Sequence, residues 1–269
     1  MLKFYSLASG SKGNATIIKS DKAMIQIDCG KNFKYLKNSY DALDLHLEDL
    51  DAVIISHGHS DHVSALKVMY NKRANYSYDF YAGFDLGIDQ FSIQAFKQFE
   101  IKDIKIIPFS LSHDSPNTLG FVIYDNDEKL VYITDTGYLK GEYLKLIENP
   151  DYLIIEANHD VTMLMESNRP YYLKQRILGV NGHLNNEDSA EISSLVIGDK
   201  TKIVALAHLS EEANDETIAL DVFKQQMNLA NKNGFYLLCL KQSELFKGEF
   251  DEECNLCTNS STFNLEFIS

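Results

Sequence analysis

The stretch Ser56-His57-Gly58-His59-Ser60-Asp61-His62 follows directly on the apolar run Ala52-Val53-Ile54-Ile55 and places three imidazoles and one carboxylate within six residues. Imidazole and carboxylate are the usual protein ligands of zinc and related metals. A polar cluster at the end of a buried strand costs desolvation free energy, and a bound metal is the simplest compensation. Three of the eight histidines of the chain fall here, which disfavours a solvated turn that is His-rich by chance. We therefore predict a metal-binding loop.

The composition is that of a folded protein that lies outside the membrane. The chain has 269 residues, 45% of them hydrophobic, which suits one large α/β domain or two small ones. Its longest apolar runs fall well short of the roughly 20 residues that a membrane helix requires. The N-terminal residues are typical of a strand and lack the long apolar core of a signal peptide. We expect a cytoplasmic protein.

The net charge of −14 restricts the way in which this protein binds nucleic acid. Proteins that bind nucleic acid through a broad surface usually present a basic patch, because neutralising phosphates supplies much of the affinity. The acidic balance argues against such a surface here. A local site in which metal ions supply the positive charge stays compatible with the composition.

Neither pair of cysteines predicts a structural metal site. Cys29 and Cys239 lie in apolar contexts typical of buried thiols. Cys254 and Cys257 form a single C-x-x-C, and the chain offers no second pair nearby to complete a zinc site. Coincidence is the preferred interpretation of that motif.

Short strands dominate the first half of the chain, and helices intervene more often in the second. β-branched and aromatic runs with Gly or Asp breaks predict strands at Leu2–Ala8, Ala15–Ile18, Ala23–Asp28, Ala52–Ser56, Asp79–Ala82, Ile104–Phe109, Thr118–Tyr124, Lys129–Thr134, Tyr152–Glu156, Lys202–Ala207 and Gly234–Leu238. Helices are predicted near 63–72, 140–148, 168–177, 187–196 and 215–231. This mixture favours two packed sheets with helices outside, in a single domain over 1–269 with a polar C-terminal tail from about residue 241.

Other metal-capable residues also follow apolar strands. Asp28, His113, Asp135 and His208 each come at or shortly after the end of a predicted strand. Taken singly, each is compatible with a loop histidine, a helix cap or a turn aspartate. Their recurrence predicts that several strands deliver side chains to one edge of the sheets.

This pattern resembles the metallo-β-lactamase superfamily. Its H-x-H-x-D-H motif is matched without a gap by His57, His59, Asp61 and His62, and its later His, Asp and His are matched in order by His113, Asp135 and His208. The resemblance spans nearly the whole chain. It implies an α/β (α+β) fold, a four-layer αβ/βα sandwich with a dinuclear metal site on one edge.

The resemblance also implies a role for each matched residue. One metal would be bound by His57, His59 and His113, and the other by Asp61, His62 and His208. Asp135 would bridge the pair, and Asp28 would orient the loop by accepting hydrogen bonds without touching a metal. Two divalent ions that share a hydroxide can provide a nucleophile at neutral pH. Mixed His and Asp ligation favours zinc, with manganese or iron as alternatives.

The bridging aspartate and the lack of a signal peptide separate this chain from the secreted lactamases of the same fold. Thioesterases, nucleases and other phosphodiesterases share the same metal chemistry. Three further motifs bear on the choice: the turn Ala8–Asn14, with Ser9, Ser11 and Asn14, the segment Glu156-Ala157-Asn158-His159-Asp160, and the segment Gly182–Ala190. The first is typical of a turn that presents N–H groups to an anion, or of an ordinary hairpin.

Together with the segment Ala207–Asn214, these motifs resemble the YycJ/WalJ-like branch of the superfamily, which implies 5′→3′ exodeoxyribonuclease activity on DNA. The resemblance implies that His183 donates a proton to the departing 3′ oxygen or holds the scissile phosphate, with Asp61 as the other catalytic residue. Ser9, Ser11, Asn14, Asn158 and His159 are the candidates for substrate binding. For His183 and His159 a purely structural role is the alternative.

The predicted activity is therefore a metal-dependent phosphodiesterase that acts on DNA, preferably on single strands or 5′ ends, through a hydroxide shared by two metals. The alternative is a small-molecule hydrolase of the same fold, acting on a thioester or a cyclic phosphodiester. The 30 Tyr and Phe side chains offer stacking platforms for bases, although the sequence does not place them.

Overall fold

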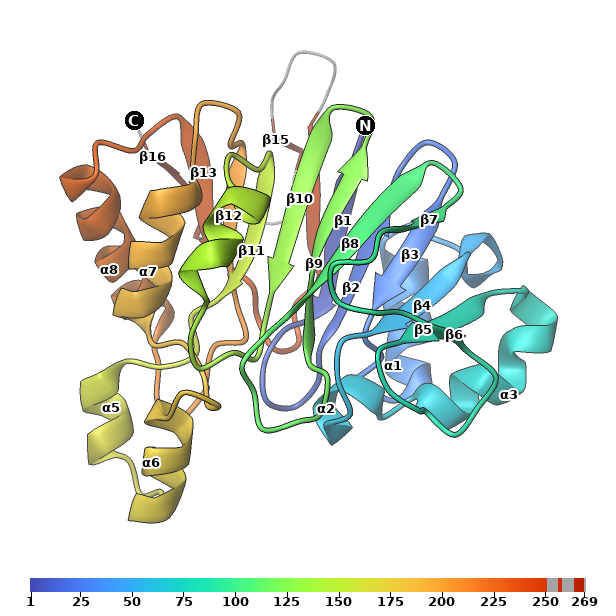
Figure 1. Ribbon diagram of the computed structural model, residues 1–269, viewed down its shortest axis with the longest axis horizontal. Coiled ribbons are helices and arrows are strands. Elements are labelled where there is room, and N and C mark those ends of the chain that lie inside the picture. The colour runs from blue at the N-terminus through green and yellow to red at the C-terminus, as the bar shows by residue number, and fades with distance from the viewer. Residues whose placement is uncertain (251–255, 258–263, 269) are drawn as a thin grey trace.

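Two mixed sheets form the centre of the computed structural model (Figure 1), which describes residues 1–250, 256–257 and 264–268. The strands of the first sheet, in sheet order, are β15 (Leu256–Cys257), β14 (Phe246–Phe250), β1 (Lys3–Ala8), β2 (Ala15–Lys19), β3 (Met24–Ile27), β4 (Ala52–Ile55), β5 (Asp79–Ala82) and β6 (Phe91–Ser92). Those of the second are β16 (Glu266–Ile268), β13 (Phe235–Cys239), β12 (Ile203–Ala207), β11 (Tyr152–Glu156), β10 (Glu128–Ile133), β9 (Leu119–Asp125), β8 (Ile104–Ser110) and β7 (Phe99–Ile101).

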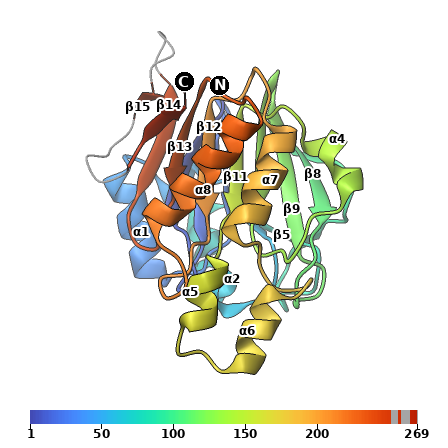
Figure 2. The same ribbon diagram turned by 90° about the vertical axis from the view of Figure 1, so that its left-hand side faces the viewer.

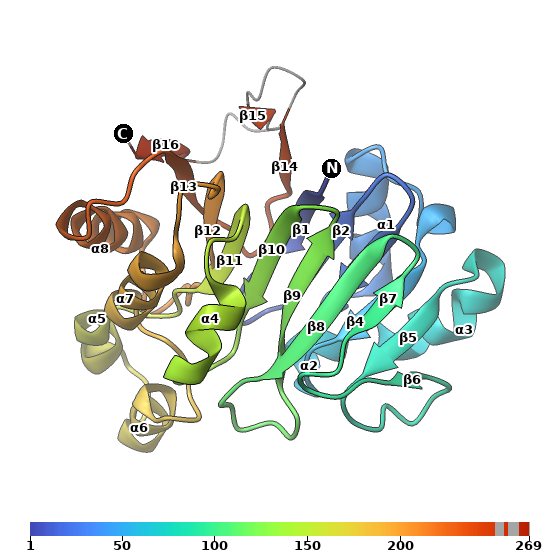
Figure 3. The same cartoon turned by 45° about the horizontal axis from the view of Figure 1, so that its top comes forward.

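Helices cover the outer face of each sheet, which gives the four layers that the sequence predicts. In Figures 1 and 3, α1 and α3 lie outside the first sheet, and α4, α7 and α8 lie outside the second. Figure 2 views the molecule from the side of α7 and α8. The helices are α1 (Phe33–Ala42), α2 (Ser60–Val63), α3 (Leu66–Tyr76), α4 (Leu144–Ile147), α5 (Val161–Glu166), α6 (Tyr171–Leu178), α7 (Asn186–Val196) and α8 (Glu216–Leu229), with the 3-10 turns η1 (Leu47–Asp49) and η2 (Gly141–Tyr143).

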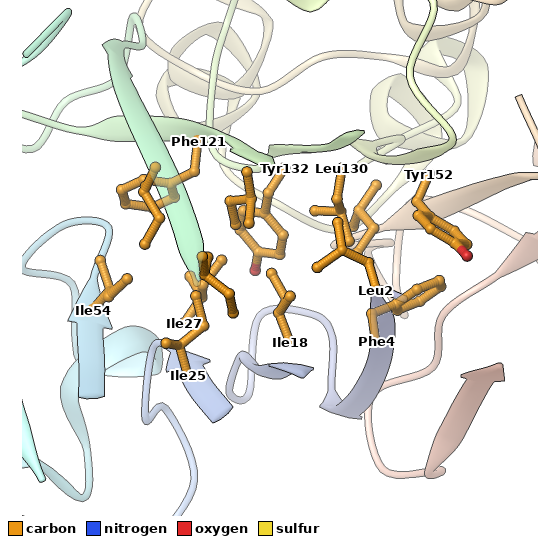
Figure 4. Packing of buried hydrophobic residues seen from close by; sticks show 14 of the residues in the cluster. Leu2, Phe4, Ile18, Ile25, Ile27, Ile54, Phe121, Leu130, Tyr132 and Tyr152 are labelled. Atoms are coloured by element: carbon orange, nitrogen blue, oxygen red, sulfur yellow. The ribbon is translucent and has the colours of Figure 1, made fainter. Parts of the chain in front are cut away.

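The faces that the two sheets turn toward each other are apolar and form the central core. Figure 4 shows side chains of the second sheet lying over those of the first. Those labelled are Phe121, Leu130, Tyr132 and Tyr152 of the second sheet, Phe4, Ile18, Ile25, Ile27 and Ile54 of the first, and Leu2 directly before β1. Two further apolar clusters lie between the sheets and their helices, one for each sheet. Because both faces of β4 and β12 are covered, these strands are apolar throughout, which is the pattern of buried parallel strands.

Parallel pairing determines where the site forms. β3, β4 and β5 run parallel in one sheet, and β10, β11, β12 and β13 run parallel in the other. The carboxyl ends of parallel strands meet at one edge, where the following loops gather. The loop after β4 and the loop between β8 and β9 lie at the same edge of the sandwich in Figure 1.

The structure confirms all eleven predicted strands, and where an end differs from the prediction it differs by one residue. It also contains elements that the sequence analysis does not predict. α1 and α5 are additional helices, each capped at its N-terminus by a polar side chain, Asn32 and Asp160 respectively. Asn185 caps α7 in the same way, accepting a hydrogen bond of 2.7 Å from the N–H of Asp188. The described residues contain no helix of the length and apolarity needed to cross a bilayer.

The segment expected to be a polar tail adds β14 and β15 to the first sheet and β16 to the second. β14 pairs antiparallel with β1, and β16 pairs antiparallel with β13. Phe246 of β14 is fully buried, with its ring centroid 5.4 Å from that of Phe4. Cys254 lies outside the described residues, and of Cys257 only the backbone, in β15, is described.

We predict that Phe246→Ala lowers the free energy of unfolding by about 3–5 kcal/mol, because it removes a fully buried ring and leaves a cavity. Leu229→Ala at the end of α8 is the control, since that side chain is 79% exposed and its loss is expected to cost about 0.5 kcal/mol or less. Urea denaturation followed by circular dichroism measures both. Equally small losses would mean that the core does not depend on this C-terminal segment.

Candidate metal centre

All seven residues that the sequence predicts as metal ligands come together at the edge of the sandwich. Among the groups near enough to hold an ion are two that match the prediction: His57, His59 and His113, then Asp61, His62 and His208. Overlapping groups are formed by His57, His62 and Asp135, and by Asp135, Glu156, His183 and His208. Within each group, one nitrogen or oxygen atom from every member lies within 4.8 Å of the others. The first sheet supplies two members of each predicted group through the loop after β4 and α2, and the second sheet supplies the third.

Asp135 lies between the two groups. Its Oδ2 is 3.2 Å from His62 Nε2, and its Oδ1 is 3.6 Å from His208 Nε2 and 3.9 Å from His113 Nε2. The carboxylate therefore reaches both groups, His113 in the first and His62 and His208 in the second, which is what a bridging ligand requires.

Three site residues adopt the left-handed backbone conformation where their strands end. The φ angles are 61° at Asp28 after β3, 59° at Asp135 after β10 and 56° at His208 after β12. For residues other than glycine this conformation costs of the order of 1–3 kcal/mol and persists only where the surroundings impose it. Its recurrence at three strand ends indicates that the fold stores strain to aim these side chains at the cluster.

The donor atoms fit a bound divalent metal. His57 Nε2 and His208 Nε2 are buried nitrogens without a hydrogen-bond partner among the described residues, although neighbouring groups satisfy most other polar atoms of the site. Leaving buried polar atoms unpaired costs about 1–3 kcal/mol each, and a metal ion would satisfy both nitrogens. Imidazole and carboxylate donors of this kind bind divalent transition metals. The cluster thus supports divalent metal binding.

Asp28 orients this cluster through its hydrogen bonds. Its carboxylate accepts from the N–H and the Oγ of Ser56, both at 2.8 Å, and lies 2.7 Å from His62 Nδ1. Because Asp28 interacts with Nδ1 of His62, Nε2 is the nitrogen that faces the other predicted ligands. Carboxylates commonly fix the orientation of ligating histidines in this way in metal proteins. This is the position that the sequence analysis expects for Asp28.

The Gly- and Ser-rich turn after β1 mainly forms hydrogen bonds to the predicted ligands, and little of it lines the cavity. Ser9 Oγ accepts a hydrogen bond of 2.8 Å from the N–H of His208, and Asn14 Nδ2 donates to Asp61 Oδ2 at 3.3 Å. Ser11 alone of the three candidates from this turn lines the cavity above the cluster. Gly30 lets the Asp61 backbone pass close by, because a Cβ at Gly30 would lie 1.6 Å from the Asp61 carbonyl oxygen.

Glu156 begins one of the motifs quoted from the sequence but is not among the predicted site residues, and the structure places its carboxylate beside the ligand cluster. This fully buried carboxylate, at the end of β11, has Oε1 2.7 Å from His183 Nδ1 and 2.8 Å from His208 Nδ1. Burial by itself raises the pKa of Glu156, but the two histidines outweigh burial and hold the pKa at about 2. The signal was present in the sequence, since Glu156 ends an apolar strand as Asp28 and Asp135 do.

His183 lies at the cavity beside the bridging position, with its Nδ1 3.8 Å from Asp135 Oδ1. Asn158 also lines the cavity, and its Nδ2 donates to the carbonyl oxygen of His208 at 2.9 Å. His159 is fully buried, does not line the cavity and has no hydrogen-bond partner for either ring nitrogen among the described residues. That position does not fit the direct substrate contact suggested for His159. Its burial lowers its pKa to about 4.

The cavity above the cluster has a volume of about 460 Å³ and is bounded by residues from both sheets. Two groups absent from the sequence analysis line it, Asp114 and Arg176, which form an ion pair. Asp114 Oδ1 also lies 3.4 Å from both His59 Nε2 and His113 Nε2. The loop after β8 therefore adds a carboxylate beside the first ligand group.

Without metal, the histidines of the second group carry the neutralising charge. Burial lowers the pKa of His208, but Asp135, Asp61 and Glu156 outweigh it and raise the pKa to about 10. Asp135 and Asp28 likewise raise the pKa of His62 well above its ordinary value. In the first group burial dominates and lowers the pKa of His57 to about 2.

The fold and this site define the class of the protein. The family described as beta-lactamase superfamily domain matches residues 24–208, and the chain belongs to that superfamily. The crystal structure of the metallo-β-lactamase fold protein YhfI from Bacillus subtilis agrees in fold, with a TM-score of 0.69 at 17% identity over 92% of this chain and 99% of that chain.

Two curated relatives narrow the class. The chain is 36% identical to exodeoxyribonuclease WalJ of Streptococcus pneumoniae over 231 residues, which cover 81% of this chain and 85% of the relative. It is 34% identical to exodeoxyribonuclease YycJ of Bacillus anthracis over 232 residues, covering 81% and 86% respectively. The protein belongs to the family that contains these two proteins.

We predict that metal binding releases protons. A histidine ligates through a neutral nitrogen, so a metal must displace the protons that His62 and His208 carry at pH 7, about two in total. Metal affinity is therefore expected to rise with pH through the neutral range. Calorimetric zinc titrations in buffers of different ionisation enthalpy measure the number released, and His208→Ala should release fewer. Zinc binding without proton release would contradict the charge state described above.

Proposed function

We propose that this protein is a metal-dependent phosphodiesterase that removes nucleotides from DNA in the 5′→3′ direction. The observation that carries the proposal is the His183–Glu156 pair, which lies directly beside the bridging position of the ligand cluster. A metal-dependent hydrolase needs a proton donor for its leaving group at that place. The relatives named exodeoxyribonuclease support DNA as the substrate.

Two divalent ions per chain are proposed, zinc first, with manganese or iron as alternatives. His57, His59 and His113 would hold one ion, Asp61, His62 and His208 the other, and Asp135 both. Ions held in this way lower the pKa of coordinated water and polarise phosphoryl oxygens. Asp61 is proposed to act in catalysis through its place in this cluster, at 3.6 Å from His208 Nε2.

His183 is proposed to protonate the departing 3′ oxygen. Its Nδ1 faces Glu156, so Nε2 is the nitrogen left for the substrate. The carboxylate of Glu156 lies 2.7 Å from Nδ1 of His183 and 2.8 Å from Nδ1 of His208, so it fixes the orientation of both rings. When the phosphodiester breaks, the proton passes to the 3′ oxygen and the water-derived oxygen stays on phosphorus.

Single-stranded 5′ ends are the proposed substrate form. The cluster lies at the base of a cavity of about 460 Å³, and a phosphate within a duplex is sterically less able to enter it. A DNA substrate also fits the expected location in the cytoplasm. The small-molecule alternative draws support from the net charge of −14, so the decisive experiment includes a thioester and a cyclic phosphodiester.

The central prediction is metal-dependent release of nucleotides from 5′-labelled single-stranded DNA. Asp61→Ala is expected to lose both metal and activity. His183→Ala is expected to retain metal and lower kcat by about 10²–10⁴-fold, the usual contribution of a proton donor. His46→Ala serves as the matched control, because His46 is exposed and lies outside the cluster. Gel analysis of the products and elemental analysis of the protein measure both properties.

Turnover of the thioester or the cyclic phosphodiester without any DNA cleavage would overturn the nuclease assignment and leave the hydrolase. Loss of metal from His183→Ala would instead make that residue part of the metal cluster and remove its proposed role as proton donor.

A further prediction concerns Glu156. Glu156→Gln is expected to lower kcat by about 10–100-fold, because outer carboxylates that orient active-site histidines typically contribute that much. Glu148→Gln is the control, since Glu148 is exposed and remote from the cluster. Steady-state kinetics with DNA measure the change. An unchanged kcat would mean that His183 and His208 keep their orientation without the negative charge of Glu156.

A further inference from the structure

The chain uses arginine sparingly, and most of its arginines lie at the site. It contains 22 lysines but only three arginines, Arg73, Arg169 and Arg176. Arg169 and Arg176 both line the cavity above the ligand cluster. Arg73 lies on α3, which Figures 1 and 3 place at the opposite end of the molecule from α6.

The two cavity arginines belong to one helical projection, the α5–α6 hairpin (161–178). The hairpin projects from the sandwich at the edge where α2 also lies, as Figures 1 and 2 show. Arg169 precedes α6, and Arg176 lies in its last turn. Leu173 and Ile177 of α6 also line the cavity, so the hairpin forms one of its walls.

Both arginines retain N–H donors for a ligand. Arg169 is 20% exposed and donates from Nε to Glu212 at 2.8 Å and from Nη2 to Ser210 at 3.2 Å. Arg176 is 56% exposed and pairs through Nε with Asp114. Since a guanidinium has five N–H donors in a rigid fork, each arginine can bind a phosphate while keeping its present partner.

The outer surface of the hairpin is apolar and aromatic. Among the described residues, five of the fifteen large hydrophobic side chains that are exposed fall within the hairpin. They are Val161, Met165, Tyr171, Tyr172 and Leu178. Tyr171 and Tyr172 are 68% and 76% exposed. They follow Arg169 in the chain by two and three residues. Exposed aromatic rings combined with arginines are the means by which proteins bind single-stranded nucleic acid without reading its sequence.

We propose that the α5–α6 hairpin holds the DNA strand. Arg169 and Arg176 bind backbone phosphates next to the scissile one, and Tyr171 and Tyr172 stack on unpaired bases. The inference rests on the proposed nuclease function and assigns its substrate-binding element. It is compatible with a net charge of −14, because it needs positive charge only at the cavity, where the two guanidinium groups lie beside the proposed metal ligands.

Arginine variants test the phosphate contacts. Arg169→Gln and Arg176→Gln are each expected to raise KM for single-stranded DNA by roughly tenfold to a hundredfold, the range for losing a hydrogen bond to a charged group. Each should also reduce, by about 0.7, the slope of the logarithm of the binding affinity against the logarithm of the salt concentration. Arg176→Lys keeps the positive charge but loses the forked set of N–H donors. Its salt dependence should therefore match that of the unaltered protein, while its KM should lie between those of the unaltered protein and Arg176→Gln. Arg73→Gln is the matched control and should behave as the unaltered protein does.

Tyrosine variants test the stacking surface. Tyr171→Ala with Tyr172→Ala is expected to weaken DNA binding about tenfold or more, measured by fluorescence anisotropy with a single-stranded oligonucleotide, without altering its salt slope. Phe267→Ala is the control, an exposed ring in β16. Sedimentation of each variant reports its oligomeric state, and metal content reports an intact centre.

The outcomes separate the two proposals. If the unaltered protein does not cleave DNA, the proposed function fails. If it does cleave DNA and the Arg169, Arg176 and tyrosine variants match their controls in KM, affinity and salt slope, the hairpin assignment fails while the nuclease stands. If the tyrosine variant changes oligomeric state and keeps its DNA affinity, the apolar surface joins two copies of this chain, which overturns its assignment to DNA.

Discussion

The constraint on which this structure depends is the burial of many ionisable groups where the two sheets meet. Asp28, Asp135 and Glu156 are buried carboxylates, and His62 and His208 are buried beside them. Transferring such charges out of water is costly unless each finds a partner or a metal. The proton-carrying histidines provide that compensation in the metal-free protein, and the same nitrogens are the proposed ligands. The charge balance that permits folding therefore also prepares the centre for a cation.

Because of this constraint, the strands and the loops after them have different roles. Strands covered on both faces supply a rigid apolar frame, and the residues just beyond their ends supply the chemistry. Positive φ angles at Asp28, Asp135 and His208 show that this transition is abrupt. Glu156 then links the ligand His208 to the cavity residue His183, so orienting one also orients the other.

The frame was largely readable from the sequence because buried strands are marked by β-branched and apolar runs. The H-x-H-x-D-H spacing likewise located the cluster. Elements with weaker local signals are not predicted: β6 and β7 are two and three residues long, and β14 lies in a segment of polar composition. In α1, Phe, Tyr, Asn, Ser and Asp, residues of weaker helix propensity, make up six of the ten positions. Arg176 and Asp114 were missed for a different reason, since only the fold brings positions 62 residues apart into contact.

The split origin of the ligands links function to the order of synthesis. Each group of three takes two members from the loop after β4 and its third from the second sheet, with His208 arriving last. A growing chain that has emerged only as far as β6 carries the histidine-rich loop without its closing partners, His113 and His208. All the proposed ligands are present only once His208 has been made, so a shorter chain lacks a complete metal centre.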